Sequence, residues 1–86
     1  MEKCLNMTII TPEGILFEGQ VEQANFPGTM GTFTIWPDHA ALMSGLTSGK
    51  ISYTNKAHHY EIPLQSGFVE IKNNIILACI ETKDKK

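Results

Sequence analysis

Hydrophobic and polar positions alternate along most of the chain, with the period of two that is typical of half-buried β-strands. The clearest case covers residues 15–22. The mostly apolar set of alternate positions is Ile15, Phe17, Gly19 and Val21, and the mostly polar set is Leu16, Glu18, Gln20 and Glu22. We expect the apolar set to face the core, because a shift of one residue in the pairing register would bury the charges.

Turn-forming residues divide the chain into short segments of this kind. Residues 11–14 and Pro27-Gly28 each end one segment, and Asn73-Asn74 separates two others. Asparagine tolerates left-handed backbone angles, so Asn73-Asn74 predicts a two-residue hairpin turn of type I′. Many short strands between closely spaced turns predict an all-β fold, a β-sandwich of about ten short strands. Only residues 40–46 suggest a short helix, so we expect little or no helix.

The length and composition fit one globular domain that spans residues 1–86, with a charged and frayed tail over residues 80–86. Hydrophobic residues make up 42% of the chain. The longest apolar run, Ile75–Ile80, is far shorter than the ~20 residues that a membrane-spanning helix needs. The N-terminus lacks the plan of a signal peptide. We therefore expect a cytosolic protein that does not insert into the membrane.

The charge balance argues against nucleic acid as a partner. Seven Lys and Arg residues stand against nine Asp and Glu residues, and the formal net charge is −2. Binding to a phosphate backbone depends on clustered positive charge, which this chain lacks outside its terminal lysines. The segment Ser48–Ile51 resembles the end of a phosphate-binding P-loop. However, the pattern requires Gly where Ser44 stands, and it requires Ser or Thr where Ile51 stands. We expect no cofactor.

A metal-dependent enzyme is the main alternative function of a different class. Its candidate ligands are Asp38, His39, His58, His59 and Glu61. Adjacent strand residues point to opposite faces, so His58 and His59 cannot both line one pocket. No motif for nucleophilic catalysis is present either, and we assign no catalytic or metal-binding residue. A small cupin-like β-barrel enzyme and a free-standing ligand-binding module stay open as alternatives.

Residues 27–42 combine turn-formers with large side chains, among them Met30, Phe33, Trp36 and His39. Two interpretations fit this composition about equally well. In one, the aromatic residues belong to the core and the glycines serve turns. In the other, a rigid loop presents apolar and aromatic groups to a partner protein, since loops on a rigid scaffold often carry function.

These motifs resemble the epsilon subunit of F-type (rotary) ATP synthases, specifically its N-terminal β-sandwich. Residues 11–19 match the family pattern T-P-x-G-x-x-F-x-G, and residues 27–42 match P-G-x-x-G-x-x-x-I-x-P-x-H-A-x-L. The resemblance covers residue 4 to about residue 82. Family members commonly add a C-terminal helical hairpin, and this chain ends at Lys86, where the hairpin would begin. We expect a short form without it, either natural or truncated.

The resemblance implies a non-catalytic subunit of the central stalk. Such a subunit links the gamma subunit to the c-ring of a proton (or sodium) translocating F-type ATP synthase, and it couples rotation to ATP synthesis. It is peripheral to the membrane, and the expected location is the cytoplasmic face of the bacterial inner membrane. ATP binding and inhibition of hydrolysis are associated with the helical hairpin in the family, so we expect neither here.

The resemblance also implies two contact surfaces. The residues that match the family's gamma-subunit interface are Thr11, His39, Ala40, Leu42 and Ser44. The residues that match its c-ring interface are Thr29, Met30, Gly31 and Thr32. The family often carries an acidic residue where Thr32 stands, so the contact here would depend on hydrogen bonds and packing.

Overall fold

The computed structural model describes residues 4–82, and this range contains nine β-strands and no helix. The predicted all-β class is confirmed, with nine strands where about ten were expected. The strands are β1 (Leu5–Thr11), β2 (Gly14–Val21), β3 (Gln23–Gly28), β4 (Gly31–Ile35), β5 (Leu42–Leu46), β6 (Gly49–Asn55), β7 (His58–Leu64), β8 (Ser66–Lys72) and β9 (Ile75–Glu81). Within the described range, nothing forms a helix long and apolar enough to cross a membrane.

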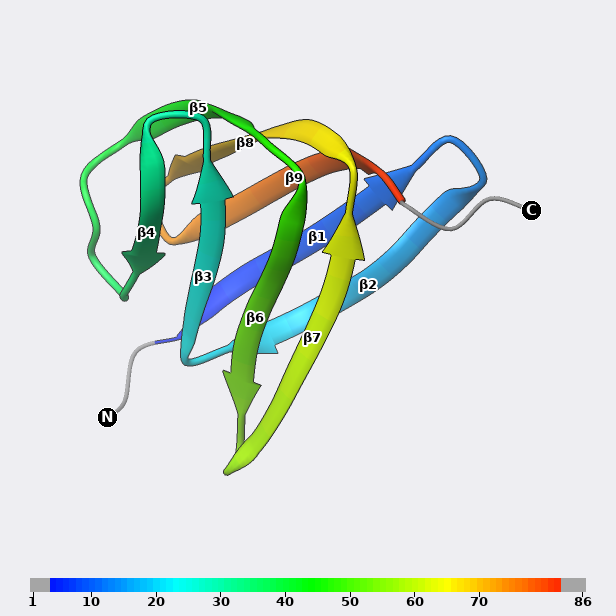
Figure 1. Cartoon of the computed structure of the whole chain (residues 1–86). Helices are drawn as coiled ribbons and strands as arrows, with labels where there is room; N and C mark the ends of the chain where they lie inside the picture. The colour runs from blue at the N-terminus through cyan, green and yellow to red at the C-terminus, as the bar shows by residue number, and fades with distance from the viewer. Residues whose placement is uncertain (1–3, 83–86) are drawn as a thin grey trace.

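The strands form one hydrogen-bonded sheet that folds over on itself into two layers (Figure 1). Its order is β2-β1-β9-β8-β5-β3-β6-β7, and β4 pairs with β3. The pair β1 and β9 is parallel, and the other pairs are antiparallel. Between β5 and β3 the ladder narrows to one pair, Gly28 and Leu46. The sheet therefore turns a corner there, and the two layers are β2-β1-β9-β8-β5 and β4-β3-β6-β7.

The core lies between the two layers and takes alternate residues from most strands. This alternation is the predicted one, because a strand with one buried face must place every second side chain inside. The buried apolar side chains are Leu5, Met7, Ile9, Val21, Ala24, Phe26, Ile35, Leu46, Ile51, Tyr53, Leu64, Val69, Ile71, Ile76, Ala78 and Ile80.

A β-bulge changes the expected register at the start of β2. Ile9 pairs with Phe17, whereas the next residue, Ile10, pairs with Ile15, so that Leu16 is an extra residue on β2. Such an insertion reverses the faces beyond it. The prediction that Ile15 faces the core is therefore wrong, and 61% of this residue is exposed. Phe17 and Val21 do lie on the inner face.

Two segments differ from the predicted secondary structure. The suggested helix over residues 40–46 is wrong, because Leu42–Leu46 pairs with β8 as a regular strand. Ser and Gly at positions 44 and 45 are weak helix formers, so the backbone bonds to β8 prevail. Ile80 and Glu81, which we placed in a frayed tail, belong to β9, and Ile80 is buried. Residues 83–86 of that tail lie outside the described residues.

The hairpin turn at Asn73-Asn74 is confirmed. Lys72 pairs with Ile75 across it, and the φ angles of Asn73 and Asn74 are 53° and 62°. Two positive φ angles in a two-residue loop define the predicted type I′ turn. This turn brings Asn74 to the same end of the sandwich as the first residues of β1, since the Asn6 amide donates to the Asn74 carbonyl (2.9 Å).

Candidate interaction surface

The turn between β3 and β4 presents one strongly exposed apolar side chain. Gly28 pairs with Gly31, which leaves Thr29 and Met30 in the two-residue turn. Met30 is 97% exposed, more than any other large hydrophobic residue of the described chain. An unbranched thioether side chain adapts its shape to a partner at low energetic cost. All four residues that were predicted to meet the c-ring, Thr29, Met30, Gly31 and Thr32, are exposed at this end of the hairpin.

The base of this hairpin is firmly packed. A Cβ atom at position 28 would lie 2.7 Å from the Gly31 carbonyl oxygen and 2.8 Å from the ring of Phe33, so only glycine fits there. The rings of Phe26 and Phe33 stack with their centroids 5.7 Å apart. The Thr29 amide donates to the Gly45 carbonyl of β5 (3.1 Å). A force on the tip would therefore reach the core directly.

A hollow of about 440 Å³ lies between this hairpin and β5. Its lining brings together residues from both predicted contact sets, because Met30, Gly31 and Thr32 face Leu42 and Ser44 across it. The remaining lining residues are Phe33 and Met43. One corner of the sandwich thus combines the residues expected to meet the c-ring with two of the five expected to meet gamma.

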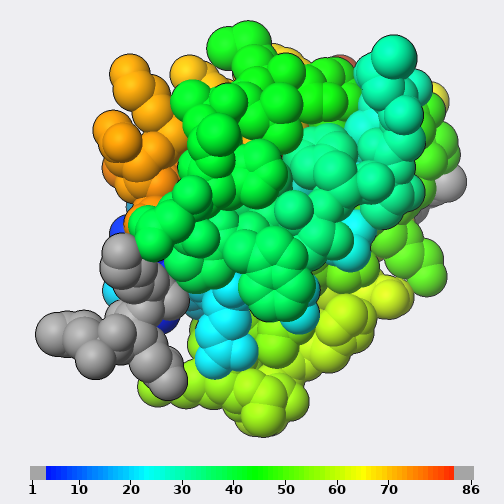
Figure 2. Space-filling view, turned by 90° about the vertical axis from the view of Figure 1, so that its left-hand side faces the viewer, coloured from blue at the N-terminus to red at the C-terminus, as the bar shows by residue number. Residues whose placement is uncertain are grey.

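His39 and Ala40 lie in the loop between β4 and β5, beside the β8–β9 turn. Figure 2 shows this end of the molecule, with the green loop next to the orange turn. The His39 amide donates to the Trp36 carbonyl (3.2 Å), and His39 Nδ1 lies 2.8 Å from the Ala40 carbonyl oxygen. Because a carbonyl can only accept, this contact places a proton on Nδ1.

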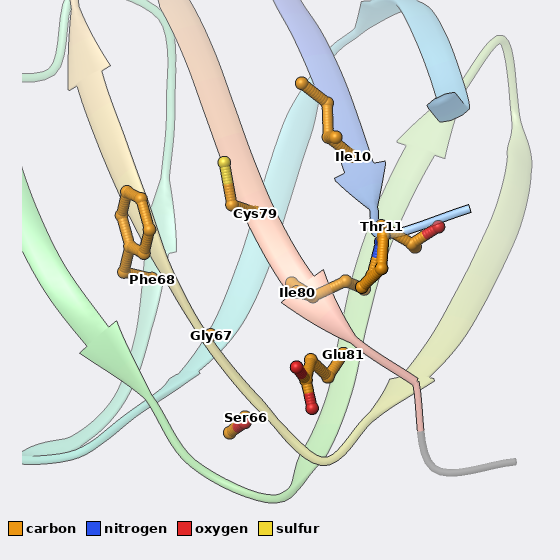
Figure 3. A pocket seen from close by; sticks show the side chains of 9 residues that line it. Ile10, Thr11, Ser66, Gly67, Phe68, Cys79, Ile80 and Glu81 are labelled. Carbon is orange, nitrogen blue, oxygen red and sulfur yellow. The ribbon is translucent and has the colours of Figure 1, made fainter. Parts of the chain in front are cut away.

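Thr11 lies at the opposite end of β9 from this loop, in a hollow of about 490 Å³ (Figure 3). Its hydroxyl donates to the Gly14 carbonyl (3.1 Å) and accepts from the Glu13 amide (3.2 Å). Thr11 is only 9% exposed. Its hydroxyl therefore serves the β1–β2 turn, and the surface that a partner could reach there belongs to its neighbours.

An apolar outer face connects these two ends, and the sequence interpretation did not identify it. Phe68 pairs with Cys79, Cys79 with Ile10, and Ile10 with Ile15, in one row across β8, β9, β1 and β2. Figure 3 shows the first three of these side chains side by side. Phe68 is 47% exposed, and Met43 and Ile75 on the same outer face are 66% and 57% exposed. Exposed Glu70 and Lys72 share this face and pair with Met43 and Ile75, so the apolar surface centres on the row through Phe68. An exposed apolar patch with polar residues around it is characteristic of a protein–protein contact.

The sequence contains a signal for this face. Residues 75–80 are apolar without interruption, whereas a strand with one solvated face alternates. A strand apolar on both faces is expected to be covered on both. The sequence interpretation used this run only to exclude a membrane span. It missed that the run also predicts a strand covered on both faces.

The candidate metal ligands do not converge. No group of three or more His, Cys, Asp or Glu residues is placed to hold a metal within residues 4–82. His59 Nε2 lies 3.5 Å from Glu61 Oε2, whereas His58 Nδ1 contacts the Lys56 carbonyl (3.2 Å). A hydrogen bond from Lys50, with its positive charge, holds the pKa of the Glu61 carboxyl below its usual value. Lys50, His59 and Glu61 thus form a solvated charge cluster on β6 and β7.

The chain resembles known proteins in its sequence. The sequence profile of the ATP synthase Delta/Epsilon chain β-sandwich domain matches residues 4–82. The ATP synthase epsilon chain of Lawsonia intracellularis is 33% identical over 85 residues, which are 99% of this chain and 64% of the relative. That of Leptospira interrogans is 38% identical over 72 residues, 84% of this chain and 57% of the relative. The chain thus spans about two thirds or less of the length of these relatives.

Two solved structures share the fold at low sequence identity. A chain of the Tetrahymena thermophila mitochondrial ATP synthase central stalk and c-ring superposes with a TM-score of 0.76 at 12% identity, over 93% of this chain and 65% of that one. A chain of the Euglena gracilis mitochondrial ATP synthase gives a TM-score of 0.86 at 10% identity, and the match covers 93% of this chain and 52% of that one. These likenesses show a shared fold, and the profile match over residues 4–82 shows the family: the chain belongs to the ATP synthase Delta/Epsilon chain β-sandwich family.

Proposed function

We propose that this chain is a non-catalytic central-stalk subunit of an F-type ATP synthase, peripheral to the cytoplasmic face of the bacterial inner membrane. In this role it links the gamma subunit to the c-ring and couples ring rotation to ATP synthesis. The observation that carries the proposal is the family match over residues 4–82. The exposed apolar outer face and the exposed hairpin tip support it, because a linking subunit needs two separate contacts.

The proposed gamma contact uses the outer face of the layer β5-β8-β9-β1. Its two ends are the His39-Ala40 loop and the surroundings of Thr11, and Phe68 lies between them. A stable interface of standard size buries about 1,200 Å² or more in total, with apolar and aromatic side chains at its centre. The row through Phe68, Cys79 and Ile10 supplies such a centre.

The proposed c-ring contact uses the β3–β4 turn. Met30 and Thr32 project at this end, whereas the β6–β7 turn lies at the opposite end of the same layer (Figure 1). Thr32 offers a hydroxyl and Met30 an adaptable apolar group, so contact with the ring loops does not require an ion pair. An exposed ion pair is worth less than about 1 kcal/mol, so its replacement by packing is energetically small.

Co-expression with the gamma subunit from the same organism tests the gamma contact. We expect a one-to-one complex that survives gel filtration. Phe68→Glu should lower the affinity at least about 30-fold, because a central apolar anchor is replaced by a charge that must be desolvated. Tyr60→Glu is the matched control, since Tyr60 is 44% exposed but lies on β7 in the other layer. Elution of both unmodified proteins as separate monomers would contradict the proposal.

A further inference from the structure

Asn74 ties together three segments that are far apart in the sequence. Its carbonyl accepts from the Asn6 amide at the start of β1 (2.9 Å). Its side-chain Oδ1 accepts from the Asp38 amide (2.6 Å), and its Nδ2 donates to Asp38 Oδ1 (3.2 Å). Through these bonds the β8–β9 turn holds both β1 and the loop of residues 36–41.

The chemistry of the two groups fixes this orientation. A backbone N–H can only donate, so the Asn74 oxygen must face Asp38 N. The amide nitrogen of Asn74 then faces the Asp38 side chain, which as a carboxylate only accepts. Both polar atoms of one amide are thus used by one residue 36 positions away. A hydrogen bond to an ionised acceptor is stronger than a neutral one.

The loop needs such support at this residue. Asp38 has a φ angle of 69°, in the left-handed region that Asp adopts more readily than most residues but less readily than glycine. Strained backbone persists when surrounding contacts determine it. His39 follows directly, and its amide closes the turn on the Trp36 carbonyl. The position of His39 and Ala40 therefore depends on how Asp38 is held.

We propose that Asn74 is a positioning residue, which acts through Asp38 to hold His39 and Ala40 in the conformation that meets the gamma subunit. This inference rests on the proposed function, and it assigns to Asn74 a role beyond the hairpin turn that the sequence predicts. Asn73, its neighbour in the same turn, has no such role: within residues 4–82 its side chain makes no hydrogen bond.

The pair Asn73 and Asn74 provides a matched test. Asn74→Gly removes the side-chain bonds but retains the turn, because Asn-Gly is the preferred pair of a type I′ turn. We expect about a tenfold loss in gamma affinity, about 1.4 kcal/mol, by isothermal titration. In the free chain, hydrogen exchange at the Asp38 amide should become about tenfold faster. The variant lacks the bond from this amide to Asn74, which must break before exchange in the unmodified chain. Asn73→Gly should change both values by less than about twofold.

A swap of the two side chains tests the specificity of the pair. Asn74→Asp alone places two carboxylates in contact and should weaken gamma binding as Asn74→Gly does, because like charges repel. The double variant D38N/N74D restores one amide and one carboxylate. Asparagine also tolerates the left-handed angle at position 38. We expect the double variant to regain gamma affinity to within about threefold of the unmodified chain. General destabilisation would not produce this recovery.

The outcomes separate the two proposals. If the unmodified chain fails to bind gamma, the proposed function is wrong. If it binds and Asn74→Gly binds equally well, or if Asn73→Gly loses as much, only the positioning role is overturned. Failure of D38N/N74D to recover while Asn74→Asp is impaired would also overturn it.

Discussion

The rings of Phe17 on β2 and Tyr53 on β6 lie with their centroids 4.6 Å apart and their planes tilted by 39°. This contact joins the two layers on the side opposite the Gly28–Leu46 corner, where backbone pairing continues from one layer to the other. Tyr53 continues the row to Tyr60 on β7, at 5.2 Å. The open side of the sandwich is therefore closed by aromatic side chains.

Replacement of Phe17 by alanine should open this side. We expect the free energy of unfolding to fall by about 2 kcal/mol, since a half-buried aromatic residue loses both its packing and its ring partner. Urea denaturation measures this change. Phe68→Ala removes the same side chain from the outer face and should cost less than about 1 kcal/mol. An equal loss in the two variants would contradict the role assigned to Phe17.

Gly67 should tolerate no side chain. A Cβ atom there would collide with the Cys79 carbonyl oxygen and lie 2.8 Å from the Ile80 Cα, and both are backbone atoms of β9. Gly67→Ala should therefore destabilise the chain by about 3 kcal/mol, since β8 and β9 must separate. Gly14 has a similar positive φ of 133° but nothing within 4 Å of the added atom. Gly14→Ala should cost only about 1 kcal/mol, and thermal unfolding compares the two.

Burial raises the pKa of the Tyr53 phenol above 10.0, and the neighbouring Tyr60 phenol adds to the shift. A raised folded-state pKa contributes stability that is fully present below pH 10.0 and lost as the pH rises through the folded value. The free energy of unfolding should thus fall less steeply in Tyr53→Phe than in the unmodified chain, between about pH 9 and about pH 11. Tyr60→Phe removes only the smaller of the two causes of the pKa shift, so it should flatten the pH dependence less, and an equal flattening there would contradict this explanation.

The orientation of the sandwich can be tested by cysteine crosslinking. In a background with Cys4 and Cys79 replaced by serine, Thr32→Cys should crosslink to cysteines engineered in the polar loops of the c-ring. Asn55→Cys, next to the β6–β7 turn, should not, because the two turns lie at opposite ends of the layer β4-β3-β6-β7 (Figure 1). Efficient crosslinks from Asn55→Cys with none from Thr32→Cys would mean that the domain is inverted.

Local patterns predicted the strands and the Asn73-Asn74 turn, because both depend on residues adjacent in sequence. The register of Ile15 was not predictable in this way. It depends on a bulge opposite Ile9 and Ile10, and hence on the pairing of two strands. Residues 42–46 became a strand because β8 offers backbone partners, which the local sequence does not reveal.

The candidate site was predicted in part, and for the same reason. The glycines and Met30 indicated the exposed β3–β4 turn, since a tight turn is a local feature. The hydrogen bonds between Asp38 and Asn74 span 36 residues, and the outer row from Phe68 to Ile10 joins three strands. Both arise from the topology. The apolar run of residues 75–80 indicates that β9 is apolar on both faces, but it does not reveal which residues of β8 and β1 lie beside it.

The most direct test of the central-stalk assignment is affinity purification of the tagged chain from native membranes in mild detergent. If the chain links gamma to the c-ring, the eluate should contain gamma, the catalytic subunits and the ring subunit together, identified by mass spectrometry. Phe68→Glu should reduce the recovery of gamma and the catalytic subunits more than that of the ring subunit, because the proposed ring contact at the β3–β4 turn does not involve Phe68. Recovery of the unmodified chain without any ATP synthase subunit would contradict the assignment.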